Sequence, residues 1–265
     1  MSMNSWYIRN GKRTESPLRL FCFAYAGASA AIFRQWIDLL APRVEVMAVE
    51  LPGHGSRRDE EPFTAIEPLV EALVPALLPE LNKPFAIFGH SLGALIGYEL
   101  ARRLYTRTGL QPRRLFVAGH SAPGCGGSAQ LVHNLPEQEF IAELRRLNGT
   151  PSDILADAEL MSLALPILRA DFRMNETYVH RSFPLLGCPV SAYGGISDSE
   201  VSSEDISAWR KITRGPFSSL LFEGDHFFIH QATPLLVRQI ELELAVGEGA
   251  RQRPLPAPGP DQSRS

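Results

Sequence analysis

The sequence predicts an α/β fold in which a mostly parallel sheet has helices on both faces and carries a helical lid insertion. The first observation is that short apolar runs alternate with helical patterns up to Ala118. The second is that no strand-like run occurs between Leu135 and Tyr178, and the third is that such runs resume at Pro189. Strands that alternate with helices form βαβ units, whose strands pair in parallel. The interruption therefore predicts a helical segment inserted into a single sheet.

The elements before the interruption follow one another regularly. Each predicted strand is a short apolar run, and a longer run with helical spacing follows it. Ser29 stands where it can cap the first helix. Pro75 lies inside the second and predicts a kink there. We expect strands at residues 18–23, 44–49, 84–88 and 114–118, and helices at residues 30–40, 66–81 and 92–104.

The interrupted region has the pattern of three short helices. The first runs from Leu135 to about Leu147 and ends at the Asn-Gly-Thr-Pro run of residues 148–151. Asp157 can cap the second, and Pro166 is expected to begin the third because proline is favoured in the first turn of a helix.

After the insertion the α/β pattern returns and ends in a Pro-, Gly- and Arg-rich tail. Strands are expected at residues 189–193 and 218–222, and helices at residues 204–211 and 233–245. The tail has the composition of a disordered segment. We therefore predict an α/β core over residues 1–122 and 189–246, a lid insertion over residues 123–188, and a disordered tail over residues 247–265.

The composition is that of an ordinary globular protein. The chain has 265 residues, 45% hydrophobic and 21% charged, which is enough for one domain with an insertion or two domains at most. Its net charge of -3 provides no general attraction to nucleic acid or to an anionic membrane. No apolar run approaches the ~18 residues that span a bilayer, and the first residues lack a targeting pattern. We expect a cytoplasmic protein.

The three cysteines are widely spaced in the sequence. Cys22, Cys125 and Cys188 show no metal-binding spacing, and their odd number does not suit a disulfide framework. We interpret them as thiols of the core or of loops in a reducing compartment.

A Gly-His-Ser-Leu-Gly run at residues 89–93 carries the strongest indication of chemistry. It lies between a predicted strand and a predicted helix. A serine at such a sharp turn exposes its hydroxyl above the edge of the sheet, so Ser91 is the predicted nucleophile. Gly-His-Ser also occurs at residues 119–121, but the second glycine and the following helix are missing there. We interpret Ser121 as a loop residue.

A serine nucleophile needs a base, and the base needs an acid that orients it. In this architecture the base follows the last strand. Of the seven histidines, only His226 and His230 follow the strand expected at residues 218–222, and His226 lies directly after it. We predict His226 as the base. His90 is expected to pack away from the hydroxyl, and His54 to cap or pack a loop.

The acid is expected in the loop after a late strand. Asp198 has this position, following the strand predicted at residues 189–193. Asp205 suits an exposed helix better, Asp225 is adjacent to the histidine in sequence, and Asp171 falls in the insertion. We therefore predict Asp198 as the acid.

The oxyanion of an acyl-transfer intermediate needs two backbone donors. The amide of Leu92 follows the nucleophile and begins a helix, where the helix dipole favours negative charge. The second donor is expected in the loop after the first strand, where Ala26 is our choice. The alternative is that this loop is simply a tight turn.

Most apolar lid residues must form a core, because short helices need a buried side. A few can line an acyl channel, and Met161 and Phe172 are the candidates, together with Tyr25 from the first loop. A group of arginines follows the serine helix and either contacts an acidic partner or forms a solvated face: Arg102, Arg103, Arg107, Arg113 and Arg114.

Four core motifs and the lid resemble those of the type II thioesterases of polyketide and nonribosomal peptide biosynthesis, over residues 17–245. Generic hydrolases do not share the lid motifs. The first loop departs from the family, which usually has proline at the position of Ala24 and glycine at that of Ala28. The motifs are Phe-Ala-Tyr-Ala-Gly-Ala-Ser at 23–29, Glu-Leu-Pro-Gly-His-Gly-Ser-Arg at 50–57, Gly-His-Ser-Leu-Gly-Ala at 89–94, Gly-Asp-His-Phe-Phe at 224–228, and in the lid Glu-Leu-Met at 159–161, Leu-Pro-Ile-Leu-Arg-Ala-Asp-Phe-Arg at 165–173 and Glu-Thr-Tyr at 176–178.

The resemblance implies an α/β-hydrolase fold and hydrolysis of acyl thioesters from the phosphopantetheine arm of a carrier protein, through a Ser-His-Asp triad and an acyl-enzyme. It implies that no metal or dissociable cofactor takes part, since the arm belongs to the partner. We expect a monomer. The alternatives are a free-ester carboxylesterase or lipase, a catalytically inactive hydrolase-fold binding protein, and a product-releasing thioesterase domain of a synthase.

Overall fold

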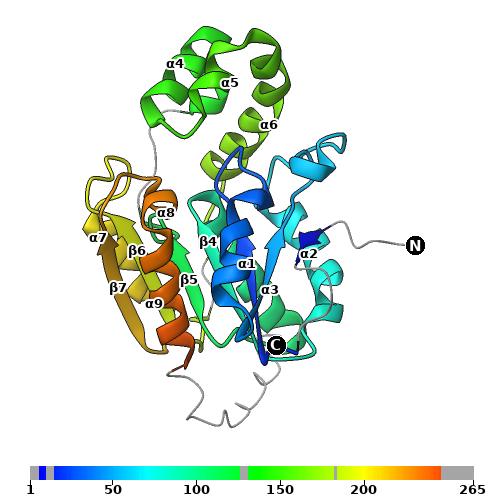
Figure 1. The fold of residues 1–265 in the computed structure, drawn as a ribbon, viewed down its shortest axis with the longest axis vertical. Helices are drawn as coiled ribbons and strands as arrows, with labels where there is room; N and C mark the ends of the chain where they lie inside the picture. The colour runs from blue at the N-terminus through cyan, green and yellow to red at the C-terminus, as the bar shows by residue number, and fades with distance from the viewer. Residues whose placement is uncertain (1–5, 10–14, 126–130, 182–183, 246–265) are drawn as a thin grey trace, which may run out of the picture.

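A seven-stranded sheet forms the centre of the computed structural model, which describes residues 6–9, 15–125, 131–181 and 184–245 (Figure 1). Its strand order is β1-β3-β2-β4-β5-β6-β7, and every neighbouring pair is parallel except β1 with β3. The predicted α/β fold is confirmed. The strands are β1 (Tyr7–Ile8), β2 (Leu18–Phe23), β3 (Val44–Val49), β4 (Phe85–His90), β5 (Leu115–Ala118), β6 (Val190–Gly195) and β7 (Phe217–Phe222).

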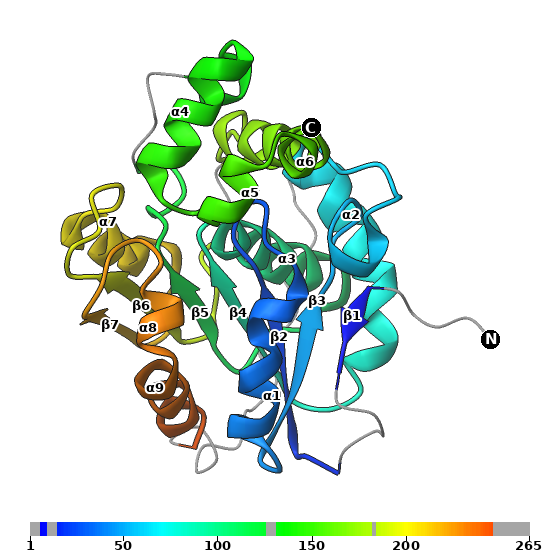
Figure 2. The same cartoon turned by 45° about the horizontal axis from the view of Figure 1, so that its top comes forward.

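Helices cover both faces of the sheet and close an apolar core on each side (Figures 1 and 2). α1 packs with α9 over one core, which contains Trp36 and Leu236. α2 packs with α3 over the other, which contains Leu73 and Leu95. Strands β2 to β6 are buried along their whole length, as parallel strands between two helical layers are. These helices are α1 (Arg34–Leu40), α2 (Ile66–Leu77), α3 (Leu92–Thr108), α7 (Ser203–Ser207), α8 (Phe228–Gln231) and α9 (Thr233–Ala245).

Three helices between β5 and β6 lie above the carboxyl edge of the sheet (Figure 1). We call α4 (Glu137–Leu147), α5 (Ser152–Ala156) and α6 (Ala158–Glu176) the lid helices. They have a small apolar core of their own, in which Phe140 and Met161 are buried. The proposed boundaries of core and lid at residues 122 and 188 stay a prediction, and the predicted tail at residues 247–265 lies outside the described part of the chain.

The second and third predicted lid helices are one helix. Asp157 does cap a helix, since its side chain accepts hydrogen bonds from the amides of Glu159 and Leu160, but this helix continues through Pro166 to Glu176. Proline cannot donate to the carbonyl four residues earlier, which belongs to Ser162. Both Pro166 and Ser162 are exposed, so water can satisfy that carbonyl. The prediction that Pro166 begins a helix was wrong for this reason.

Other differences concern the ends of elements. The helix expected at residues 66–81 ends at Leu77 and gives way to a 3-10 turn, with Pro75 still inside the α-helix. The helix expected at residues 204–211 is a short α-helix followed by a 3-10 helix. The two-residue strand β1 was not predicted because so short a segment has no periodicity to read.

Candidate active site

Ser91 occupies a strained turn between β4 and α3. Its backbone φ of 53° is positive, a conformation that non-glycine residues rarely adopt and that clusters at active sites. The flanking glycines are required by contact. A Cβ on Gly89 would lie 2.0 Å from the carbonyl oxygen of Gly93, and one on Gly93 would lie 2.3 Å from that of Phe23. Both neighbours are backbone and cannot move aside, so the Gly-x-Ser-x-Gly spacing follows from packing.

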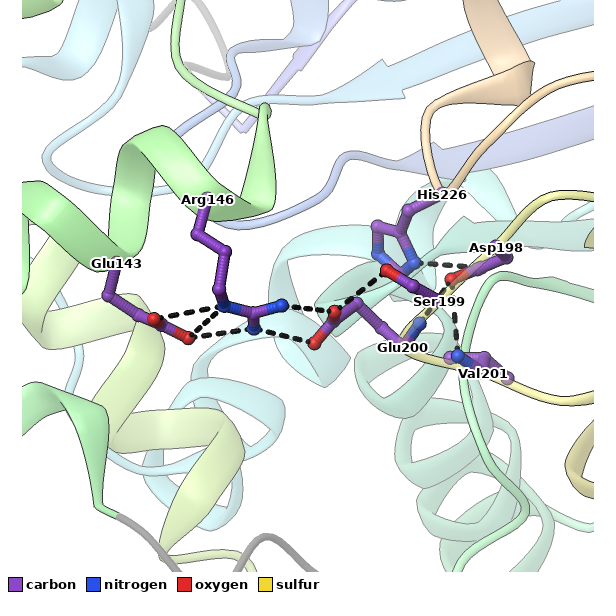
Figure 3. Close-up of polar contacts among 7 residues, drawn as sticks. All are labelled: Glu143, Arg146, Asp198, Ser199, Glu200, Val201 and His226. Carbon is purple, nitrogen blue, oxygen red and sulfur yellow. Dashed lines mark hydrogen bonds and ion pairs between the residues drawn. The ribbon is translucent and has the colours of Figure 1, made fainter.

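The structure brings Ser91, His226 and Asp198 together at the carboxyl edge of the sheet. His226 Nε2 lies 3.1 Å from Ser91 Oγ, and His226 Nδ1 lies 2.9 Å from Asp198 Oδ2. The second oxygen of Asp198 accepts hydrogen bonds from the amides of Glu200 at 2.8 Å and Val201 at 3.1 Å (Figure 3). Since the carboxylate can only accept from Nδ1–H, Nε2 is left to accept the serine proton. The geometry suits a serine nucleophile with its base and orienting acid.

His90 is fully buried behind His226, in accordance with the expectation that it packs. The two imidazole rings are 5.5 Å apart between centroids, and His90 also contacts Tyr25 and Phe228 edge to face. Burial and the nearby His226 hold the pKa of His90 well below its ordinary value. The neutral ring of His90 therefore packs against the base. It does not repel His226 when His226 gains a proton.

A cavity of about 810 Å³ opens on Ser91 and His226 between the core and the lid helices. This volume is within the range of sites for small organic ligands. Tyr25 and Phe172, both predicted to contact substrate, line it. Met161 does not, because it packs into the core between the lid helices, where Phe140 also lies. Other lid residues supply the apolar lining: Leu144, Leu147 and Leu168.

Both predicted oxyanion donors border this cavity. Leu92 is the first residue of α3, where an amide has no partner within the helix. Ala26 lies in a turn closed by a 3.0 Å hydrogen bond from the amide of Ala28 to the carbonyl of Tyr25. A turn of this kind leaves its two central amides out of the closing bond. The Ala26 amide is one of them, so it is available to a ligand.

One end of the lid is tied to the loop that carries Asp198. Arg146 of α4 binds Glu143 on its own helix and Glu200 in the loop after β6, with Nη1–Oε1 and Nη2–Oε2 distances to Glu200 of 2.8 and 3.1 Å (Figure 3). Hydrogen bonds from Arg146 lower the pKa of Glu200. Glu200 is also the residue whose amide holds Asp198.

The competing candidates are occupied elsewhere. Asp205 forms a capping box with Ser202, Asp225 accepts from the amide of Phe227, and His230 bonds to the Tyr25 hydroxyl at 2.8 Å. Ser121 borders the cavity through a loop, as expected, and its carbonyl pairs with His120 Nδ1.

Sequence reasoning missed several polar groups of this cavity. His120 Nε2 lies 3.0 Å from the Asn175 side chain of α6, and burial lowers the pKa of His120. Arg146 and Glu200 were missed as well. Each pair joins residues more than 50 positions apart, so no local pattern could have indicated it.

Comparison with known proteins agrees with this geometry. The sequence model of the thioesterase domain family matches residues 18–244. The protein belongs to the thioesterase family. The resemblance inferred from the motifs is thereby confirmed, and the chain is an enzyme of the thioester-hydrolase class.

Several known proteins are similar to this thioesterase over most of its length. It is 39% identical over 247 residues to the gramicidin S biosynthesis protein GrsT of Aneurinibacillus migulanus, covering 92% of this chain and 96% of that one. It is also 39% identical to thioesterase PikA5 of Streptomyces venezuelae, over 92% and 87% of the two chains. Its fold matches the type II thioesterase BorB of the borrelidin cluster with a TM-score of 0.84 and 36% identity, over 91% and 98% of the chains.

Within its described residues, the thioesterase has no helix long and apolar enough to cross a membrane.

Proposed function

We propose that this thioesterase is an editing enzyme, which hydrolyses acyl thioesters from the phosphopantetheine arm of acyl or peptidyl carrier proteins. The observation that carries the proposal is the Ser91–His226–Asp198 relay at the base of a cavity that the lid helices roof. The relatives, which include a type II thioesterase, support the substrate class.

The reaction follows from the geometry in two halves. Ser91 Oγ attacks the acyl carbon while His226 Nε2 takes its proton, and Asp198 stabilises the imidazolium. The amides of Ala26 and Leu92 bind the oxyanion. The C–S bond then breaks, and His226 returns the proton to the leaving thiol. Water repeats the sequence on the acyl-enzyme to release a carboxylic acid and Ser91. No step needs a metal or a dissociable cofactor, because the pantetheine thiol belongs to the partner.

The apolar side chains of the lid suit the acyl chain of such a substrate. Leu144 and Leu147 line the cavity from α4, and Phe172 lines it from α6. His120 and Asn175 also line the cavity and offer polar groups to oxygens along the acyl chain. We expect the protein to act as a cytoplasmic monomer on a separate carrier protein.

The arginines in and after α3 do not favour a carrier docking site. Arg103 and Arg107 both bind Glu71, Arg102 binds Glu99, and Arg114 binds Glu243. These carboxylates offset the positive charge that the sequence suggested. At ~1.5 Å per residue, Arg107 also lies about 22 Å along α3 from its first residue, which borders the cavity. The alternative of a solvated face without a docking role fits better.

The test is intact mass spectrometry of carrier proteins loaded with different acyl groups. We expect the protein to remove the acyl group and leave the pantetheine arm on the carrier, and Ser91→Ala to leave the loaded carrier unchanged. Parallel assays with p-nitrophenyl esters address the free-ester alternative. A strong preference for the free ester over every loaded carrier would contradict the proposed substrate.

A further inference from the structure

A buried ion pair outside the triad joins the lid to the core. His54, in the loop after β3, places Nε2 2.8 Å from Asp171 Oδ2 on α6. The side chains are 4% and 2% exposed. Neither residue belongs to the triad or borders the cavity. A buried pair of this kind costs desolvation energy. Its position between the lid and two core loops indicates a role beyond packing.

The two hydrogen-bond partners of the His54 ring favour the form that carries both protons. Nδ1 lies 3.0 Å from the carbonyl oxygen of Pro52, and Nε2 faces the carboxylate of Asp171. Both partners can only accept, whereas a neutral imidazole has one N–H. Burial lowers the pKa of His54, but the hydrogen bond and charge of Asp171, the Pro52 carbonyl and the charge of Glu50 outweigh it, and the pKa is raised. Asp171 therefore faces a cation.

The same carboxylate oxygen holds the turn of the predicted oxyanion hole. Asp171 Oδ2 accepts a 2.7 Å hydrogen bond from the amide of Gly27. One helical turn earlier, Leu168 fills the space beside Gly27, where a Cβ would lie 2.4 Å from Leu168 Cδ2. α6 thus holds Gly27 by two contacts. Asp171 provides the polar contact, and Leu168 provides the apolar contact.

The peptide that carries the Gly27 amide adjoins the one that carries the predicted donor, the Ala26 amide. Ala26 and Gly27 are the central residues of the turn closed from Ala28 to Tyr25, and Gly27 has a φ of 79°. Types I and II of such a turn differ by rotation of the peptide between the two central residues. A positive φ at the second one belongs to type II. The bond from Gly27 N–H to Asp171 selects this orientation and thereby sets the backbone of Ala26.

We propose that Asp171, paired with His54, is a positioning residue that holds the oxyanion turn so that the Ala26 amide faces the acyl oxygen. This inference rests on the proposed catalytic site. It links the lid to the chemistry, because α6 can present Asp171 to the turn only when it is seated on the core.

The charged groups that act on His54 are Asp171 from α6 and Glu50 from the end of β3. Glu50 is engaged by the amides of Ala30 at 2.9 Å and Ser56 at 3.4 Å. Loss of the His54 proton at high pH leaves two buried carboxylates without their shared cation. The Gly27 contact is then expected to loosen on the alkaline side.

The test compares variants on a soluble acyl thioester of N-acetylcysteamine, together with thermal melts. We expect Asp171→Ala to lower kcat about 10- to 100-fold while KM changes less than about 3-fold, because the loss of a whole oxyanion donor costs about 10²–10³ in kcat. Asp171→Asn can still accept from Gly27 and is expected to recover most of this loss. It also preserves the side-chain volume, so it reports on the charge even if Asp171→Ala fails to fold.

Two further variants separate positioning from simple stability. Asp157→Ala removes the cap of α6 without touching the turn, and we expect it to lower the melting temperature with kcat unchanged. His54→Gln keeps a donor to Asp171 but cannot titrate. We therefore expect its kcat to fall less at high pH than the kcat of the wild type. Wild-type kcat in Asp171→Ala, or equal kcat losses in Asp171→Ala and Asp157→Ala, would overturn the inference. Activity surviving in Ser91→Ala would instead refute the catalytic site itself.

Discussion

Arg146 of the lid helix α4 forms a two-point ion pair with Glu200, and Glu200 donates its amide to Asp198. One lid residue is therefore three contacts away from His226, through Glu200 and Asp198. The residues after α4 contact the histidine loop as well: Asn148 reaches Asp225 at 3.5 Å. The lid thus touches the loops that carry two members of the triad.

The first prediction concerns this ion pair. Arg146→Ala is expected to lower stability by only ~0.2–1 kcal/mol, because the pair is partly exposed. It is expected to lower kcat/KM more at low than at high salt, since the Debye length falls from ~10 Å at 0.1 M to ~3 Å at 1 M. Steady-state kinetics at both salt concentrations measure this. Arg145→Ala, on the same helix, is the control. Identical salt profiles in the two variants would rule out a role of the Arg146–Glu200 ion pair in activity.

The second prediction concerns the triad. His226→Ala is expected to lower kcat by ~10⁶-fold and Asp198→Asn by ~10⁴-fold, because the base moves the proton and the acid only sets its tautomer. The double variant should be little slower than His226→Ala, since the residues act as a unit. Kinetics on one thioester substrate give all three numbers. Additive losses in the double variant would show that Asp198 acts independently of His226.

The third prediction concerns the close contact at the elbow. Gly93→Ala is expected to destabilise the fold by ~1–3 kcal/mol or more, since its Cβ meets the Phe23 carbonyl at 2.3 Å. Gly109→Ala is the matched control, because its φ of 72° is strained but nothing lies within 4 Å of its Cβ. Urea unfolding of both variants measures the difference. A smaller loss at residue 93 than at residue 109 would count against the packing argument.

The fourth prediction concerns acid stability. The pKa of His90 is lower in the folded than in the unfolded chain, so the unfolded chain binds its proton more readily. The stability that neutral His90 contributes is fully present above its unfolded pKa of ~6.5 and is lost as pH falls towards its folded pKa. His90→Phe keeps an aromatic ring beside His226. In this variant we expect stability to depend less on pH in this acidic range. Melting temperatures between pH 5 and 8 test it, and an unchanged slope in His90→Phe would show that other groups cause the acid loss.

The sequence was sufficient for the features that depend on local pattern or on chain order. The elbow could be predicted because its glycines and its flanking strand and helix are contiguous. Asp198 and His226 could be selected because each follows a late strand, and the structure places His226 beside Ser91 and Asp198 beside His226.

Features that depend on the approach of distant segments could not be predicted. His54 and Asp171 are 117 residues apart, and no local pattern indicates that they pair. Pro166 suggested a helix start, although solvent tolerates it inside α6. Met161 and Phe172 were equal candidates to line the cavity, yet only Phe172 borders it. The packing of the three lid helices decides which side chains face the cavity.

The most direct test of the central claim is rapid-quench peptide mass spectrometry after mixing the protein with an acyl-loaded carrier protein. We predict a transient mass increase equal to the acyl group on the peptide that contains Ser91, and its absence in Ser91→Ala. Release of the acyl group without any modification at Ser91, or modification of another residue, would contradict the account.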